Sequence, residues 1–214
     1  MSIPKVVGIE EEYAIHMYGD HGFTPFQASC AMVNAYARKA GLRKPGTAVL
    51  WDYGHETPFN DIRGRLFGKN TGQESLSEEE NIRINTILPN GARLYTDHAH
   101  PEYSTPECLS ARDAVACDRA GELVLRQALA GMRELLGMSK VELFKNNIDY
   151  QGHSYGCHEN YLMDAEAHQE CFVRSPEKAV RTLVPFLVTR QLYAGTGRIG
   201  SERPGEAAVR RRCR

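Results

Sequence analysis

The 214-residue sequence has no long run of apolar residues and no marked excess of charge of either sign. A transmembrane helix needs about 20 consecutive apolar residues, so none is expected. The formal net charge is −1 at pH 7, which gives no global electrostatic reason to bind nucleic acid or an anionic membrane. The first residues, MSIPKVVGIEEEYAIH, lack the apolar core of a signal peptide. A cytoplasmic protein is therefore the default expectation.

Closely spaced cysteine pairs are also missing. The six cysteines form no CxxC motif, and no Cys or His pair at zinc-finger spacing is matched by a second one. A structural zinc site is therefore disfavoured, and reduced structural thiols are expected. The remaining composition is ordinary for a globular protein, with 42% hydrophobic and 25% charged residues. The length suits one large domain or two small ones.

Hydrophobic periodicity predicts an α+β protein. Alternation predicts strands at 5–16 and 92–98, and a hairpin formed by 140–147 and 153–163. Helical spacing predicts helices at 24–41, 111–136 and 177–193. Residues 55–90 read as one long irregular segment, which is uncommon in a compact domain unless it is functional or disordered. The apolar stripe predicted for the long helix comprises Ala114, Val115, Leu123, Val124, Ala128, Leu129 and Leu135.

Carboxylates gather on one face of the first predicted strand. Glu10 and Glu12 are two residues apart, so their Cβ atoms would lie about 6–7 Å apart on the same side. With Glu102 as a third carboxylate, this spacing suits one hard cation or two adjacent ones, Mg²⁺ or Mn²⁺ rather than Zn²⁺. A polar strand face in water is the simpler interpretation. Glu11 falls on the apolar face, which a strand end or a local partner would explain.

Residues 91–106, GARLYTDHAHPEYSTP, hold the densest group of reactive side chains. Alternation places Arg93, Tyr95 and Asp97 on one face of a strand. Asp97 could act as a base on water or as a nucleophile on an acyl or phosphoryl group, or it could simply cap the turn that follows. Arg93 could hold a phosphate through two hydrogen bonds, or it could form a surface ion pair.

The histidines give weaker signals. His158 shares a predicted strand face with Asn160, which suits a metal or phosphate contact, or an ordinary core or edge histidine. Spacing suggests no partner for His98 or His100. The segment GTGRIG at 195–200 lacks the Lys-Ser/Thr pair of a P-loop, so it is only a weak candidate for a phosphate loop. Residue patterns alone thus predict an α+β protein with a possible Mg²⁺ carboxylate site.

Several separate motifs resemble the depupylase (Dop) branch of the Pup ligase/depupylase family, whose members act on the prokaryotic ubiquitin-like protein Pup. They occur in the family's order and span residues 5–200, so a chance match is a poor explanation. The motifs are GIEEEYAI, WDYGHETPFNDIRG, NGARLYTDHAHPEYSTPE, KNNID, SYGCHENYLM and PFLVTRQ followed by GTGRIG.

The resemblance implies a glutamine synthetase-like fold. In that fold a curved antiparallel sheet cradles ATP and Mg²⁺, and helices pack on its convex side. The motifs also imply a site by position. Asp97 would be the catalytic aspartate, and Arg93 and Thr105 would contact the nucleotide. The residues on the metal side would be Glu10, Glu12, Tyr95, Glu102 and His158.

The implied reaction is hydrolysis of the isopeptide bond between the C-terminal Glu of Pup and a substrate lysine. Deamidation of a C-terminal Gln of Pup is the same acyl chemistry, and Mg-ATP would be the bound cofactor. Pup and pupylated proteins would be the partners, with an indirect link to the bacterial proteasome. Pup–protein ligase activity is the alternative, because both enzymes share the site. The long segment at 55–90 and the motif TDHAHPEY resemble the depupylase branch more than the ligase branch.

The sequence departs from the family pattern in two respects. Glu11 stands where an uncharged residue is usual between the two glutamates. Family members are also much longer, and residues 201–214, SERPGEAAVRRRCR, form an atypical Arg-rich tail. We therefore expect residues 1–200 to form the N-terminal part of an incomplete catalytic domain and the tail to reflect a truncation or frame artefact. An inactive fragment is then a further alternative.

Overall fold

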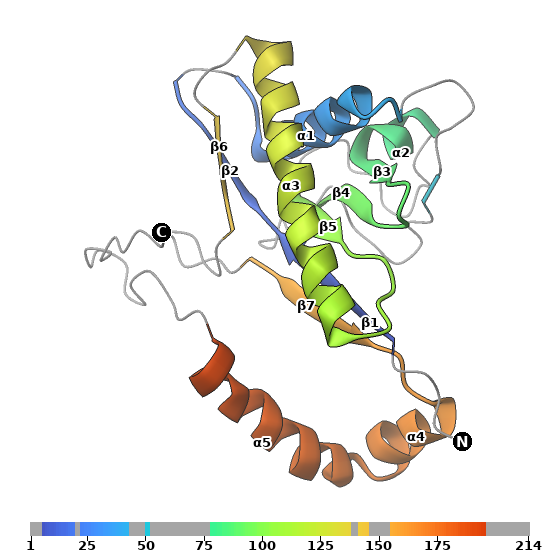
Figure 1. Cartoon of the computed structure of the whole chain (residues 1–214). Helices are drawn as coiled ribbons and strands as arrows, with labels where there is room; N and C mark the ends of the chain where they lie inside the picture. The colour runs from blue at the N-terminus through green and yellow to red at the C-terminus, as the bar shows by residue number, and fades with distance from the viewer. Residues whose placement is uncertain are drawn as a thin grey trace.

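A computed structural model describes residues 6–19, 22–42, 50–51, 78–137, 141–145 and 155–195. Within these ranges, a five-stranded sheet has the order β3-β4-β5-β1-β7, and β2 and β6 form a second sheet (Figure 1). The strands are β1 Val7–Glu12, β2 Ala14–Met17, β3 Asn85–Ile87, β4 Arg93–Asp97, β5 His100–Ser104, β6 Val141–Phe144 and β7 Cys157–Tyr161. The helices are α1 Pro25–Lys39, α2 Glu78–Ile84, α3 Ala111–Leu136, α4 Ala165–His168, the π-helix η1 Gln169–Arg174 and α5 Pro176–Ala194.

Strand pairing differs from two of the predictions. The predicted strand at 5–16 is interrupted at Tyr13: β1 pairs with β5 and β7, whereas β2 pairs with β6 in the other sheet. The predicted hairpin is wrong, because β6 and β7 belong to different sheets. Alternation identifies an extended segment and its faces, but it does not specify the partner strand.

Helix ends follow the local capping signals. Thr24 and Gln27 form a capping box before α1, and Gly41, just beyond the C-cap residue, has a positive φ of 72°. Ser110 accepts a hydrogen bond from the backbone N–H of Asp113 at the start of α3. The predicted helices at 24–41, 111–136 and 177–193 are confirmed.

Part of the segment predicted to be irregular is ordered. Helix α2 and strand β3 occupy 78–87, so that prediction is wrong there. Residues 55–77 of the segment, residues 196–200 of GTGRIG and the tail lie outside the described ranges. The cysteines that the structure describes are free thiols, as predicted. No described helix has the length and hydropathy needed to cross a membrane.

Helices α1 and α3 pack on one face of the five-stranded sheet (Figure 1). Tyr103 of β5 points to this face, and its ring lies directly against Gly121 of α3. The hydroxyl of Ser29 in α1 donates a hydrogen bond to the hydroxyl of Thr96 in β4, at 2.9 Å. The core between these layers includes Met32, Val33, Leu94, Leu125 and Met132.

Glu11 points to this helix-covered face and has a local partner. Its carboxylate lies 3.9 Å from Lys145 Nζ, which also pairs with Asp118 of α3 at 2.8 Å. Burial raises the pKa of Glu11, against the lowering effects of a hydrogen bond with Cys157 and of the Lys145 charge. A local partner, Lys145, rather than a strand end thus explains why Glu11 lies on the apolar face.

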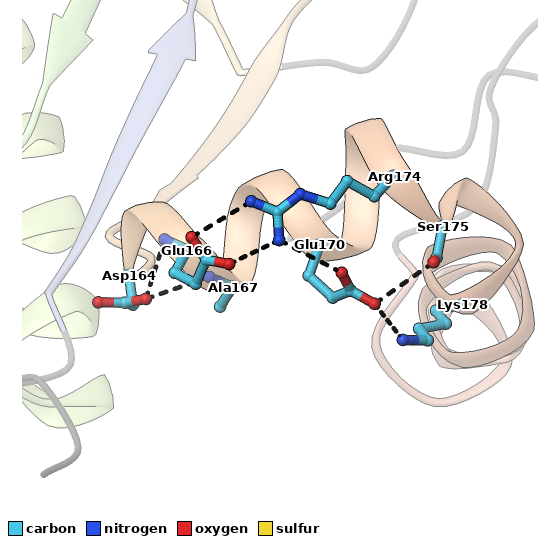
Figure 2. Close-up of polar contacts among 7 residues, drawn as sticks. All are labelled: Asp164, Glu166, Ala167, Glu170, Arg174, Ser175 and Lys178. Atoms are coloured by element: carbon cyan, nitrogen blue, oxygen red, sulfur yellow. Dashed lines mark hydrogen bonds and ion pairs between the residues drawn. The ribbon is translucent and has the colours of Figure 1, made fainter.

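Helices α4, η1 and α5 form an arm that lies apart from α1 and α3 (Figure 1). Figure 2 shows the polar contacts along it, with Arg174 donating to Glu166 at 2.6 Å and Lys178 pairing with Glu170. An ion pair of 2.6 Å between Arg190 of α5 and Glu159 of β7 joins the arm to the sheet.

Candidate functional site

The face of the sheet opposite the helices collects the predicted site residues. In the register of β1, Glu10 lies opposite His158 of β7, and Glu12 lies opposite Glu102 of β5. Glu102 in turn lies opposite Tyr95 of β4. Directly paired residues share a face, so alternation along four strands brings these side chains together. Arg93 and Asp97 occur at alternate positions with Tyr95 and lie on the same face.

Glu102 is the most deeply buried acid of this face, with 1% of its surface exposed. Tyr95 donates a hydrogen bond to its Oε1 at 2.6 Å, whereas Oε2 has no hydrogen-bond partner among the described residues. Burial raises the pKa of Glu102 to about 8, partly offset by the Tyr95 hydrogen bond and reinforced by nearby acids. A buried oxygen without a donor is costly unless a proton or a cation satisfies it.

Glu102 also belongs to a group of possible metal ligands. Glu10, Glu102 and His158 each offer an atom within 4.8 Å of the others, and His158 Nδ1 lies 3.0 Å from Glu10 Oε2. The two carboxylates suit Mg²⁺ or Mn²⁺, and Glu102 has one oxygen without a hydrogen-bond partner among the described residues with which to bind such a cation. Tyr95 reaches this group through its hydrogen bond to Glu102.

A second group of possible metal ligands lies on the same sheet face, which we call the acidic face. Glu12, Asp97 and His98 also offer atoms within 4.8 Å of one another. Glu12 was predicted to accompany Glu10, but the structure groups it with the predicted catalytic aspartate. The spacing of Glu10 and Glu12 in the sequence was compatible with one cation or with two adjacent ones. In the structure these two glutamates belong to two separate groups of possible ligands.

Glu12 is held by two hydrogen bonds. Its Oε2 lies 3.0 Å from His100 Nδ1 and accepts the backbone N–H of Gly156 at 2.9 Å. Burial alone would raise the pKa of Glu12, but these contacts outweigh it and lower the pKa. A Cβ at position 156 would lie 3.1 Å from Glu12 and 3.2 Å from His158, so these side chains would have to shift slightly to accommodate any residue other than glycine.

Asp97 contacts the histidine that follows it in sequence. His98 Nδ1 lies 2.6 Å from Asp97 Oδ2, and this hydrogen bond raises the pKa of His98. Residue spacing suggested no partner for His98 or His100, but each contacts a carboxylate in the structure. The turn between β4 and β5 brings His98 to Asp97, whereas the pairing of β5 with β1 brings His100 to Glu12.

The two predicted nucleotide contacts differ in their surroundings. Arg93 is buried, its Nε donates to Asn85 Oδ1 at 2.8 Å, and its guanidinium lies 3.8 Å from the Trp51 ring centroid and 3.6 Å from that of Tyr95. This position does not match a surface ion pair. Thr105 accepts a hydrogen bond from the backbone N–H of Ile9 through Oγ1, at 3.0 Å, which places it beside β1.

Comparison with known proteins gives consistent results along the sequence. The family model described as Pup-ligase protein matches residues 5–210. The Pup deamidase/depupylase of Mycobacterium tuberculosis (strain ATCC 25618 / H37Rv) is 42% identical over 198 residues, and the depupylase of Acidothermus cellulolyticus is 43% identical over 199. Each match covers 92% of this chain and 37% of the relative. A Pup–protein ligase of Bifidobacterium adolescentis is 49% identical over 125 residues, covering 55% of this chain and 24% of the ligase.

A solved structure shares the fold. A chain in the crystal structure of the complex between Pup and its ligase PafA has a TM-score of 0.61 and 27% identity, covering 96% of this chain and 33% of that chain. The antiparallel sheet, with helices on one face and acids on the other, defines a domain of the glutamine synthetase-like class, as predicted. The chain belongs to the Pup-ligase protein family. It spans 37% of the length of the curated relatives named above that match most of it.

Proposed function

We propose that this chain carries the catalytic face of a depupylase and Pup deamidase. The supporting observation is that Asp97 belongs to one of two carboxylate-rich groups on one sheet face. The other group contains Glu102, whose Oε2 is fully buried and has no hydrogen-bond partner among the described residues. The choice of hydrolase over ligase rests on likeness, because the relatives named depupylase match 92% of the chain and the ligase named above matches 55%. The proposed setting is the cytoplasm, with Pup and pupylated proteins as partners and an indirect link to the bacterial proteasome.

The residues present fit the proposed cofactors. Glu10, Glu102 and His158 would hold a divalent cation, with Glu12 as a further carboxylate near Asp97. Arg93 and Thr105 would face the nucleotide. When bound, Mg²⁺ and the nucleotide supply positive charge and polarisation to developing negative charge on the substrate.

Asp97 would carry the acyl chemistry. As a base, its carboxylate takes a proton from water, whose oxygen then adds to the carbonyl carbon of the isopeptide bond. The carbon–nitrogen bond breaks, and the lysine amine leaves with a proton. As a nucleophile, the carboxylate would itself add to that carbon, and water would later hydrolyse the intermediate. With a C-terminal Gln of Pup, ammonia takes the place of the lysine amine.

The test is turnover of Pup by the parent chain and by Asp97→Asn. With Mg²⁺ and ATP, the parent is expected to release Pup from a conjugate and ammonia from Pup ending in Gln. Because general base or nucleophilic catalysis contributes about 10²–10⁴-fold, Asp97→Asn should lower the rate by at least ~100-fold. Asp164→Asn, at the exposed N-cap of α4, is the matched control and should leave the rate unchanged.

Three outcomes would count against this proposal. Equal rates in Asp97→Asn and the parent would reject the assignment of Asp97. Conjugation of Pup to lysine without release of ammonia would favour the ligase alternative. A parent chain with neither turnover nor detectable binding of Mg-ATP by calorimetry would favour the inactive fragment.

A further inference from the structure

The connection between β4 and β5 has an unusual choice of residues. The two strands are joined by His98 and Ala99 alone, and Asp97 pairs directly with His100 across the hairpin. Both connecting residues have positive φ, 45° for His98 and 70° for Ala99. Two-residue hairpins with this conformation favour Asn-Gly, because a side chain with Cβ is disfavoured in the left-handed region. Strain of this kind persists where the surroundings impose it, and it is concentrated at functional sites.

The strained turn brings the imidazole of His98 to the carboxylate of Asp97. In an extended strand, neighbouring side chains point to opposite faces and cannot meet in this way. Here His98 Nδ1 lies 2.6 Å from Asp97 Oδ2. Ala99, the second residue of the turn, is 4% exposed.

The same hairpin places a second imidazole against a second acid. His100 Nδ1 lies 3.0 Å from Glu12 Oε2, and its ring lies 4.8 Å from that of Tyr155, measured between centroids. Each histidine therefore uses Nδ1 toward a carboxylate of the acidic face. Of the two histidines, His98 is the one that contacts Asp97.

We propose that His98 is a positioning residue for Asp97, whose Nδ1–H holds carboxylate oxygen Oδ2 and thereby fixes the side chain with Oδ1 directed to the reacting group. An ionised carboxylate only accepts hydrogen bonds, so the proton of this contact lies on Nδ1. The inference deepens the proposed function and rests on it for the role of Asp97. On this proposal, the left-handed conformation of His98 serves its contact with Asp97 and does not serve the stability of the fold.

Substitutions in the turn separate positioning from folding. His98→Ala removes the donor but keeps a side chain with Cβ in the left-handed region. His98→Asn places an amide N–H donor at the same distance from the backbone, and asparagine is better tolerated in this conformation. Ala99→Gly relieves the turn without altering the imidazole and is the control.

The expected pattern differs between the three variants. Loss of an orienting hydrogen bond costs about 10–100-fold, so His98→Ala should lower kcat by that factor and leave KM unchanged. His98→Asn should restore most of the lost kcat, and Ala99→Gly should leave it unchanged. His98→Asn is also expected to raise the melting temperature, because asparagine tolerates the left-handed conformation. A cooperative melting transition for each variant would show that it folds. The proposal is overturned if His98→Asn is as slow as His98→Ala, or if His98→Ala retains full kcat.

A second measurement needs no turnover. In ¹⁵N-histidine-labelled parent chain without metal, Nδ1 of His98 should carry a proton, and Asp97→Asn should shift its resonance. Nδ1 without a proton would overturn the proposal. So would broadening of Nδ1 by Mn²⁺ with no response to Asp97→Asn, because His98 would then be a metal ligand. If the parent has no turnover, the proposed function fails, while this experiment still decides the contact.

Discussion

At the scale of single residues, Glu102 offers the most direct test of the metal site. Its carboxyl has a pKa of about 8 in the folded chain, mainly because it is buried, against 4.5 for an exposed glutamate. Between these pH values the unfolded chain has released a proton that the folded chain still holds. The free energy of unfolding must therefore fall as the pH rises from 4.5 to about 8.

Glu102→Gln should remove this pH dependence. Glutamine keeps an acceptor for the Tyr95 hydroxyl but does not titrate. In EDTA, the parent should lose on the order of 2 kcal/mol or more of unfolding free energy between pH 5 and pH 8, and the variant correspondingly less. Mg²⁺ at pH 8 should stabilise the parent by displacing the proton. It should stabilise the variant less, because the variant keeps only the ligand group of Glu12, Asp97 and His98 intact. Urea unfolding at both pH values, with and without Mg²⁺, measures these differences.

The surface residue Glu107 supplies the control for this comparison. Glu107→Gln should reproduce the parent at both pH values, because its side chain is exposed. Burial also raises the pKa of Glu11, but Glu11 is present in every protein compared, so its effect cancels. Parallel pH profiles for the parent and Glu102→Gln would contradict the assigned pKa shift.

The predictable and unpredictable parts of the site differ for a physical reason. Strand period alone placed Arg93, Tyr95 and Asp97 on one face, and the β4 backbone puts them there. It could not find the His98 contact, because a left-handed turn brings together neighbours that a strand would separate. Strand periodicity also could not predict the contact between Arg93 and the Trp51 ring, because the two residues are far apart in the sequence and belong to no common strand.

At the scale of elements, α3 shows where the sequence pattern gave an incomplete account. Its predicted stripe included Leu123, which is 57% exposed, but not Leu125, which is fully buried. The helix packs closely through small residues, and a Cβ at Gly131 would lie 3.1 Å from the Ala35 carbonyl oxygen of α1. Periodicity weighted by large apolar side chains misses an interface of this kind, although it located both ends of the helix.

Gly121→Ala tests this close packing. Alanine normally stabilises a helix interior by about 1 kcal/mol relative to glycine. Here the new Cβ would lie 2.4 Å from the Tyr103 ring, so the ring or the helix must move. Overpacking of this kind costs about 1–3 kcal/mol, and we expect a net loss of unfolding free energy.

Two further variants show whether the Tyr103 contact is responsible. Tyr103→Leu combined with Gly121→Ala should recover part of the stability, because the ring is gone. Ala120→Gly, one position away on α3, reports the ordinary helix effect and should destabilise by about 1 kcal/mol. A more stable Gly121→Ala single variant would show that the helix stands further from β5 than described.

At the scale of the whole molecule, the arm α4–η1–α5 differs from the layered domain. Large apolar side chains along α5 are exposed, including Leu192 at 84% and Tyr193 at 90%. Of its described residues, Arg190 joins it to the sheet through Glu159. Helices gain most of their stability from packing of an apolar face, so α5 should open at a lower free energy than α3.

Trypsin can measure this difference within one molecule. Arg181 of α5 and Arg126 of α3 are both exposed and both lie well inside a helix, so their side chains are equally available. Cleavage requires local unfolding, and each 1.4 kcal/mol in the opening free energy changes the cleavage rate about tenfold. We expect cleavage after Arg181 to be at least ~10-fold faster than after Arg126, as followed by mass spectrometry. Arg190→Gln, which removes the ion pair with Glu159, should widen the ratio without changing cleavage at Arg126. Equal rates at the two sites would mean that α5 is held as firmly as α3.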